Sequence, residues 1–325
     1  MRSSGHHHRR LLPPASPFLA LCLTSVTRIQ PSVLARLSTS RTARNTATEF
    51  SCKMAKRKAI YQHDETLRTH STRVSSVRPF SALPEADRAL FKGAADVDMV
   101  LVTDETIFYA QGGGQPFDTG VMASAAAKLQ VSAVRNSVAT PGAILHLGRC
   151  TEGTLREGDA VEQLIDAERR DDNSRLHTGR HLVALAVRKH LLAGAVDDAS
   201  HKDLVELGAS HYPDSAYVNF QGTIEAAHKD AIQEHVDAFI NAGLPVKVYF
   251  WTEEELRARC AAVPGAVVIR GEDGGLVRAV GIEGAGAYPC GGTHVRDTSL
   301  VGKVTVKKIS RSKGCSRVSY TVQHP

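Results

Sequence analysis

The sequence predicts an α+β protein in which a β-barrel-like domain is followed by a second α+β domain with an antiparallel or mixed sheet. Residues 60–158 hold short, strand-like runs that are separated by Gly and Pro. Amphipathic segments of helical length follow that region, and further strand-like runs lie between and after them. We therefore expect a leader over residues 1–55, the barrel-like domain over 56–160 and the second domain over 161–325.

The leader carries the basic charge of the chain. Residues 1–53 contain seven Arg, one Lys and one acidic residue, Glu49, so they carry +7 and the rest of the chain −1, against a total of +6. The basic total therefore does not indicate that the folded body binds nucleic acid as a whole. The Arg, Ser and Pro content of the leader is typical of a mitochondrial transit peptide. The alternative is that translation starts at Met54 and that the protein is cytoplasmic.

Neither a membrane span nor a disulfide framework is expected. The nearest approach to a span is the short apolar run Phe18–Leu23, whereas a transmembrane helix needs about 18 apolar residues or more. The cysteines have no paired spacing, which favours a reducing compartment. They are Cys22, Cys52, Cys150, Cys260, Cys290 and Cys315.

The first domain is predicted to hold short strands, and a long helix is predicted to open the second. Apolar and β-branched residues concentrate in three candidate strands, Asp98–Val102, Lys128–Val134 and Ala143–Leu147. The charged stretch 167–172 is predicted to be a turn. A helix of roughly five turns is then expected to begin at an Asn173 or Ser174 cap and to end before Gly194.

The remainder of the second domain alternates strands with helices. A second helix is expected over about 223–242, where apolar residues such as Ile232 and Val236 recur at helical spacing. Thr252 and Glu255 have the spacing of a capping box, which predicts a short helix. The expected strands cover residues 203–207, 215–220, 245–251, 266–270 and 275–282, and a C-terminal hairpin follows them.

Four residues form a candidate metal site. His177 and His181 are expected to project from one helix face about 5–6 Å apart. Such a pair alone is more often a solvated helix face than a metal site. Far downstream, however, Cys290 and His294 flank a Gly-Gly-Thr turn. Thiolate and imidazole are the ligands that zinc prefers, so we predict one zinc ion per chain, held by His177, His181 and Cys290 with His294 as the fourth ligand or adjacent to the ion.

The role of the predicted zinc ion stays open at this point. Thr178 follows His177, so the glutamate of the HExxH zinc proteases is absent. A closed four-ligand site is normally structural, whereas catalysis needs an open position. The sequence leaves open whether His294 is a fourth ligand or only flanks the ion.

Several motifs together resemble a known family. HTGRH (177–181), CGGTHV (290–295) and the closing stretch 302–320 are similar to the editing domain that alanyl-tRNA synthetases share with the AlaX-type alanyl-tRNA editing proteins. The glycine-rich stretch 104–120 resembles the motif that this family carries on a preceding β-barrel domain. The similarity covers roughly residues 60–322, and it departs from the common pattern where Gly, a poor helix former, replaces Ala within HTGRH.

The resemblance implies a zinc-dependent, trans-acting hydrolase that deacylates mischarged tRNA(Ala), chiefly carrying serine and in some members glycine. The partner is then the acceptor end of tRNA(Ala). As groups that would contact the acylated end we select Gln115 in the glycine-rich loop, Ser210 or its neighbour His211, and Thr293 within the metal turn. For the loop, the alternative is an ordinary glycine-rich turn. The competing function is a zinc-stabilised tRNA-binding module without catalysis.

The C-terminal hairpin is the clearest candidate for nucleic-acid contact. No acidic residue interrupts its basic side chains, which favours binding of RNA phosphates. Exposed lysines on an edge hairpin also protect against aggregation, which is the alternative. The basic side chains belong to Lys303, Lys307, Lys308, Arg311, Lys313 and Arg317.

Overall fold

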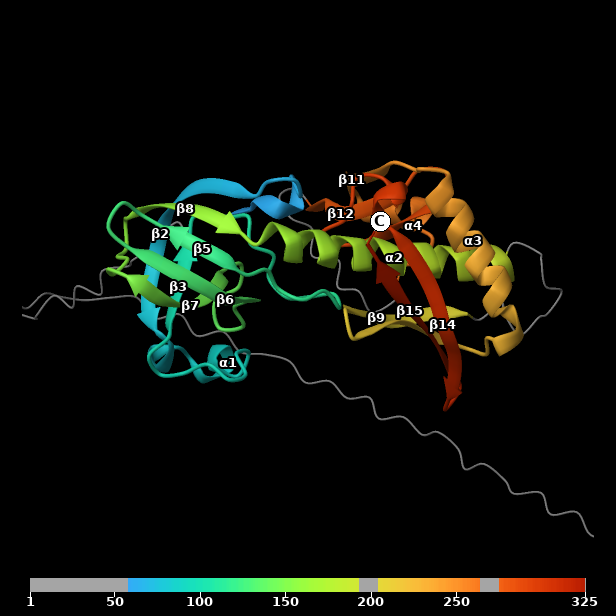
Figure 1. The fold of residues 1–325 in the computed structure, drawn as a ribbon, viewed down its shortest axis with the longest axis horizontal. Coiled ribbons are helices and arrows are strands. Elements are labelled where there is room, and N and C mark those ends of the chain that lie inside the picture. Colours follow the sequence, from blue (N-terminus) through green and yellow to red (C-terminus); the bar gives the residue numbers. More distant parts are fainter. Residues whose placement is uncertain (1–57, 193–203, 264–274, 325) are drawn as a thin grey trace, which may run out of the picture. The chain divides into compact units, whose positions relative to one another are not determined.

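A computed structural model describes residues 58–192, 204–263 and 275–324 (Figure 1). Within the continuous stretch 58–192, six antiparallel strands close into a barrel, which confirms the predicted barrel-like architecture. Around the barrel they are β2 (Thr69–Pro79), β3 (Met99–Thr103), β7 (Ile144–Glu152), β6 (Lys128–Asn136), β5 (Gly120–Ala123) and β8 (Ala160–Ile165).

Alternating side chains fill the barrel. Leu101, Met122 and Leu129 are fully buried inside it, each on a different strand. Because successive side chains of a strand point to opposite faces, one apolar residue in two suffices to build this core. Short elements accompany the strands: β1 (Lys58–Ala59), η1 (Ile60–Gln62), η2 (Phe80–Ala82), α1 (Glu85–Arg88) and β4 (Glu105–Thr106).

The long helix α2 (Ala167–Leu192) begins earlier than predicted. The charged stretch 167–172, which we expected to be a turn, forms its first turns. Asp166 accepts a hydrogen bond from the backbone N–H of Arg169 at 3.1 Å, so it supplies the polar group that a helix start requires. Arg170 is buried in an ion pair with Asp118. The predicted helix end near Gly194 lies outside the described residues.

A four-stranded sheet among the described residues packs against α2. Its order is β14 (Lys303–Ser312), β15 (Cys315–Gln323), β10 (Ser215–Gln221) and β9 (Val205–Tyr212), and all its pairs are antiparallel. The C-terminal hairpin is thus confirmed, and Figure 1 shows it in red. A Cβ on Gly179 would lie 3.1 Å from Val322 Cγ2 and 3.4 Å from Val304 Cγ2, so glycine suits the close contact between helix and sheet.

The remaining described elements are a second sheet and four helices. Three antiparallel strands, β11 (Val246–Trp251), β12 (Val277–Ile282) and β13 (Gly286–Pro289), make a second sheet. The helices are η4 (Ala226–His228), α3 (Lys229–Asn241), α4 (Glu253–Arg259) and η6 (Thr298–Val301). The capping box of Thr252 and Glu255 on α4 is confirmed, whereas α3 begins later than predicted. The strand predicted over 266–270 lies outside the described residues.

None of the helices in the described part of the chain is long and apolar enough to cross a membrane.

Candidate metal centre

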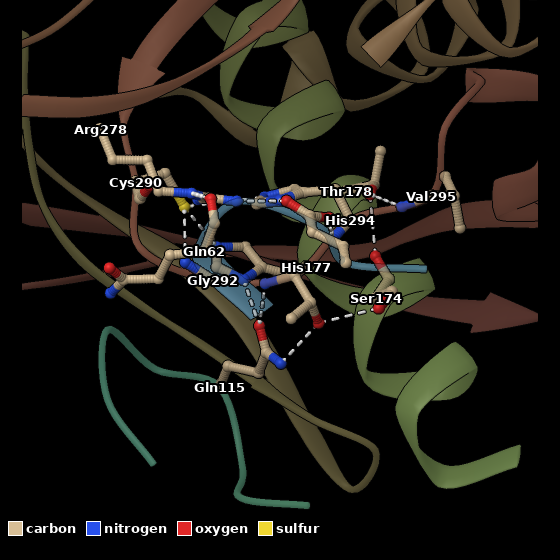
Figure 2. A network of polar contacts seen from close by, with 12 residues as sticks. Gln62, Gln115, Ser174, His177, Thr178, Arg278, Cys290, Gly292, His294 and Val295 are labelled. Atoms are coloured by element: carbon tan, nitrogen blue, oxygen red, sulfur yellow. Dashed lines mark hydrogen bonds and ion pairs between the residues drawn. The ribbon is translucent and has the colours of Figure 1, made fainter. Parts of the chain in front are cut away.

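Two distant segments bring the four predicted ligands together. Helix α2 supplies His177 and His181, whose rings stack with centroids 5.1 Å apart, as expected for positions one turn apart. The turn after β13 supplies Cys290 and His294. The sulfur of Cys290 lies 3.4 Å from Nε2 of His177 and 3.6 Å from Nε2 of His294 (Figure 2). With His181 included, all four ligand atoms lie within 4.8 Å of one another.

This spacing fits a metal ion. Four ligands bonded to zinc at about 2.0–2.3 Å in a tetrahedron lie roughly 3.3–3.8 Å from one another. The Nε2 atom of His181 is buried without a hydrogen-bond partner among the described residues. Because a buried polar atom is costly to leave unpaired, this atom has a physical reason to bind an ion. The three histidines and the cysteine can therefore hold a metal ion.

The protonation of the ligands also suits metal binding. Burial, reinforced by neighbouring positive groups, lowers the pKa of His177 and of His181 well below the ordinary imidazole value, so both are neutral. Burial alone would raise the pKa of the Cys290 thiol, but His294 and Arg278 lower it. Burial opposes the charge on His294, yet the Cys290 sulfur and Glu65 raise its pKa to about 9. The cluster thus offers two neutral imidazoles, those of His177 and His181, and an acidified thiol, whereas His294 would have to release a proton in order to bind an ion.

The glycine turn permits the close approach of the two segments. A Cβ on Gly292 would lie 2.2 Å from Cε1 of His177 and 2.8 Å from Oε1 of Gln115, so any side chain there would displace them. The backbone N–H of Gly292 also donates to the Cys290 sulfur at 3.4 Å. Glycine at this position is therefore a requirement of the site.

Gln115 orients the first histidine. Its Oε1 accepts hydrogen bonds from Nδ1 of His177 at 2.7 Å and from the backbone N–H of Thr293 at 3.0 Å, and its Nε2 donates to Oγ1 of Thr293 at 2.9 Å. Proton donation from Nδ1 leaves Nε2 of His177 with a free lone pair that faces Cys290. Both Gln115 and Thr293 are fully buried. A direct contact of either residue with substrate stays a prediction.

The network continues into α2. The Ser174 hydroxyl lies 2.8 Å from Oγ1 of Thr293, and it donates to the backbone carbonyl of Arg170 at 2.8 Å. Since the Ser174 proton is engaged there, the Thr293 hydroxyl donates to Ser174. The glycine-rich loop, the metal turn and the helix are thus joined by one chain of hydrogen bonds (Figure 2).

Glu65 and Arg278 belong to the site, although neither residue lies in a recognisable motif. Glu65 accepts a hydrogen bond from the backbone N–H of His294 at 2.5 Å and pairs with the guanidinium of Arg278. Arg278 in turn donates to the backbone carbonyl of Cys290 at 2.5 Å and to that of Gln62 at 2.7 Å. The two side chains fix the backbone on both sides of the metal turn.

A cavity of about 460 Å³ opens beside the ligands. His177, His181 and Cys290 form part of its wall. From β9, His211 also lines the cavity, and its ring stacks on that of His177 with centroids 4.2 Å apart. Nε2 of His211 donates to the Gly113 carbonyl at 3.1 Å, which leaves Nδ1 as a buried acceptor without a partner among the described residues.

Ser210 occupies a different position. Ala209 and His211, on either side of it in β9, line the cavity, and neighbouring side chains of a strand point to opposite faces. Ser210 therefore points toward the other face of the sheet, where Tyr217 is its partner across β10. Its predicted contact with substrate stays a prediction.

The glycine-rich loop forms one rim of the cavity. Gly112 and Gly113 line it, and the carbonyl of Gly114 accepts a hydrogen bond from the backbone N–H of His211 at 3.0 Å. Gly114 has φ +88°, and a Cβ there would lie 2.5 Å from the Ala209 carbonyl oxygen. The loop thus needs glycine in order to lie against β9.

The basic residues of the hairpin are all exposed. A β-bulge between Val306 and Lys308 breaks the strand alternation, so neighbouring Lys307 and Lys308 are both turned to solvent. Arg311 pairs with the exposed Glu225 at 2.6 Å. Arg317 lies over the ring of Tyr217, 3.7 Å from its centroid. The binding of nucleic acid by these residues stays a prediction.

Two family models match the chain. Residues 28–169 match the class II (A) tRNA synthetases, and residues 277–319 match the second additional domain of threonyl and alanyl tRNA synthetases. The second match contains Cys290 and His294.

Similar proteins include synthetases and an editing protein. The chain is 32% identical over 222 residues to the alanine–tRNA ligase of Frankia alni, which covers 67% of this chain and 23% of the ligase. For the ligase of Thermotoga maritima the identity is 31%, over 69% of this chain and 25% of the ligase. The alanyl-tRNA editing protein AlaX-L of Pyrococcus horikoshii is 28% identical over 265 residues, 81% of this chain and 57% of that protein.

The chain thus spans about a quarter of the length of these ligases and 57% of AlaX-L. The matches cover both the barrel and the metal turn, and the four candidate ligand residues converge in the structure, with His177, His181 and Cys290 lining a cavity. This chain belongs to the alanyl-tRNA synthetase editing-domain family.

Proposed function

We propose that this chain is a zinc-dependent hydrolase that deacylates mischarged tRNA(Ala), with serine as the first expected amino acid and glycine as the second. The observation that carries the proposal is the group of His177, His181, Cys290 and His294, three of which line an open cavity, within a chain of the editing-domain family. A purely structural zinc site has no need of a cavity of this size beside it.

The chemistry of alanine explains why such an activity is needed. A synthetase pocket that fits a methyl group cannot exclude glycine, which is smaller. It also rejects serine poorly, because an apolar pocket discriminates only modestly against an added hydroxyl. A second site that hydrogen-bonds the serine hydroxyl would leave its own polar groups unpaired with alanine, and so it would spare the correct product.

The residues of the site suit both tasks, cleavage of the ester and recognition of the serine hydroxyl. The ligands would hold the ion, and when bound, zinc supplies Lewis acidity toward an ester carbonyl or a water molecule. Nδ1 of His211 is a buried acceptor beside His177, which makes His211 the candidate for the serine hydroxyl that the cavity geometry favours. Gln115 would be a positioning residue: it would orient His177 directly and the metal turn through its hydrogen bond with Thr293.

The partner would be the acceptor end of tRNA(Ala), held partly by the exposed basic hairpin. Its basic side chains are all exposed, and no acidic residue interrupts them in the sequence, although Glu225 pairs with Arg311. Phosphate contacts of this kind position the RNA without reading its sequence.

One experiment tests the proposal. Ser-tRNA(Ala), Gly-tRNA(Ala) and Ala-tRNA(Ala) are incubated with zinc-loaded protein, with chelator-treated protein and with treated protein to which zinc is returned. We expect release of serine, and more slowly of glycine, only where zinc is present, with the alanyl ester spared. If all three esters survive with loaded protein that still binds the tRNA, the chain is instead a non-catalytic zinc-stabilised binding module.

A further inference from the structure

The charge of the cavity wall is one-sided. Among the described residues that line the cavity there is no Asp and no Glu. Arg180 belongs to that wall and carries a full positive charge. It lies on α2 between the ligands His177 and His181. Its Nη1 is 3.2 Å from Nδ1 of His181, so the positive charge stands next to the metal cluster.

The counter-charge of Arg180 lies away from the cavity. Nη2 of Arg180 donates to Oε2 of Glu206 at 2.6 Å, and Glu206 is 3% exposed and is not part of the cavity wall. The same carboxylate lies 4.0 Å from Nη1 of Arg188. The carboxylate of Glu206 is therefore shared between the guanidinium groups of Arg180 and Arg188. Because that carboxylate lies outside the cavity wall, the electrostatic potential of the Arg180–Glu206 pair is positive on the cavity side.

The other titratable groups of the wall supply no compensating charge. Burial raises the pKa of Tyr61 to about 12 and that of Tyr109 well above its ordinary value, so both phenols are neutral. His211 is neutral or cationic and never anionic, so it supplies no counter-charge to Arg180 either. The sulfur of Cys290 is one of the four metal ligands.

An aminoacyl ester brings a positive charge of its own into this cavity. Its α-amino group titrates at about pH 7–8 and is cationic below that range. The cation would lose water, face Arg180 and find no carboxylate, which is an unfavourable way to bury a charge. An uncharged substituent at the same carbon avoids this cost.

We propose that Arg180 makes the cavity select acyl esters whose α-substituent is uncharged, so that α-hydroxyacyl esters on the same RNA are substrates alongside neutral aminoacyl esters. The inference rests on the proposed deacylase function. The reaction is the same hydrolysis: the water oxygen bonds to the acyl carbon, the bond from that carbon to the ribose oxygen breaks, and the ribose oxygen takes the proton. Arg180 is thereby a specificity-determining residue.

The test compares two esters that differ in a single group. Ser-tRNA(Ala) is converted with nitrous acid into its glyceroyl ester, in which a hydroxyl replaces the α-amino group and the β-hydroxyl is kept. kcat/KM of the zinc-loaded protein is measured for both, after subtraction of uncatalysed hydrolysis. We expect the glyceroyl ester to be favoured about tenfold or more at about pH 6 and nearly equal at about pH 8. The ratio cancels any pH dependence that the enzyme shows with both esters.

Two variants assign the effect to Arg180. Arg180→Gln should reduce the preference at about pH 6 by about threefold or more, whereas Arg180→Lys should keep it, because only the latter retains the charge. Zinc content and thermal unfolding are recorded for each variant. A ratio within one protein does not depend on the fraction of active enzyme.

The outcomes separate the two proposals. If loaded protein hydrolyses neither ester, the proposed function fails. If it hydrolyses the seryl ester at least as fast as the glyceroyl ester at about pH 6, the deacylase stands and the role of Arg180 is overturned. An unchanged preference in folded, zinc-loaded Arg180→Gln overturns that role as well.

Discussion

Nδ1 of His177 lies 2.7 Å from Oε1 of Gln115, although the two residues are 62 positions apart and belong to the long helix and to the glycine-rich loop. The contact ties the orientation of a candidate metal ligand to a residue outside the four-residue group. It gives the glycine-rich loop a role in the metal centre besides its place at the rim of the cavity.

Gln115→Ala is expected to weaken metal binding by about 10- to 100-fold, because loss of a hydrogen-bond partner of a ligating histidine typically has this effect. Competition with a calibrated chelator measures the Kd of the ion. Gln323→Ala, at an exposed position on β15, is the matched control and should leave the Kd unchanged. Equal affinities for the two variants would contradict the positioning role of Gln115.

Gly292→Ala should abolish metal binding, since the new Cβ would lie 2.2 Å from Cε1 of His177. The neighbouring substitution Gly291→Ala is the control, because its Cβ would meet nothing closer than Nε2 of Gln62 at 3.9 Å. Elemental analysis of both purified proteins gives the answer. Full metal content in Gly292→Ala would show that the turn does not need to lie against His177 as closely as described.

The fold and the ligands could be predicted because their signals are local. The four candidate ligands follow from two short motifs, and three of the six barrel strands, β3, β6 and β7, follow from apolar runs between turns. Glu65 could not be found in this way, because it acts on His294 through a backbone contact across 229 positions. The early start of α2 could not be predicted, because nothing in its charged first turn indicates that Arg170 is buried. That burial depends on the ion pair with Asp118, which lies in a distant loop.

Double substitution of Lys307 and Lys308 by Ala should weaken tRNA binding and lower the steepness of its salt dependence. Each lost phosphate contact reduces the slope of log K against log salt by about one. Filter binding at several salt concentrations measures both quantities. Lys92→Ala, at an exposed position elsewhere, is the control. An unchanged slope in the double variant would assign the hairpin lysines to protection against aggregation.

The barrel should lose stability on mild acidification because of His146. This side chain is fully buried, with Nδ1 donating to the Leu101 carbonyl at 3.1 Å and Nε2 accepting from the Thr106 hydroxyl at 2.9 Å. Burial lowers its pKa to about 4, below the ordinary value of about 6.5 that applies when unfolded. The contribution of neutral His146 to the stability of the folded state is therefore complete above about pH 6.5, and it is lost progressively as the pH falls toward 4.

The free energy of unfolding is expected to fall by about 3 kcal/mol over the whole pH range and by about 2 kcal/mol by about pH 5. Urea unfolding at about pH 7.5 and about pH 5 measures it, and His146→Gln should lose about 2 kcal/mol less between the two values. The variant is expected to be less stable at neutral pH. Identical losses in both proteins would show that His146 does not set this dependence.

The proposed zinc ion would be held jointly by imidazoles from α2 and by the sulfur of the glycine turn. Elemental analysis of the native protein, together with X-ray absorption spectroscopy, measures the metal content and identifies the atoms bonded to the ion. We expect one zinc per chain with a single sulfur and nitrogen neighbours, and loss of the sulfur contribution in Cys290→Ala. Native protein without a transition metal, or zinc without a sulfur neighbour, would show that no such shared site exists.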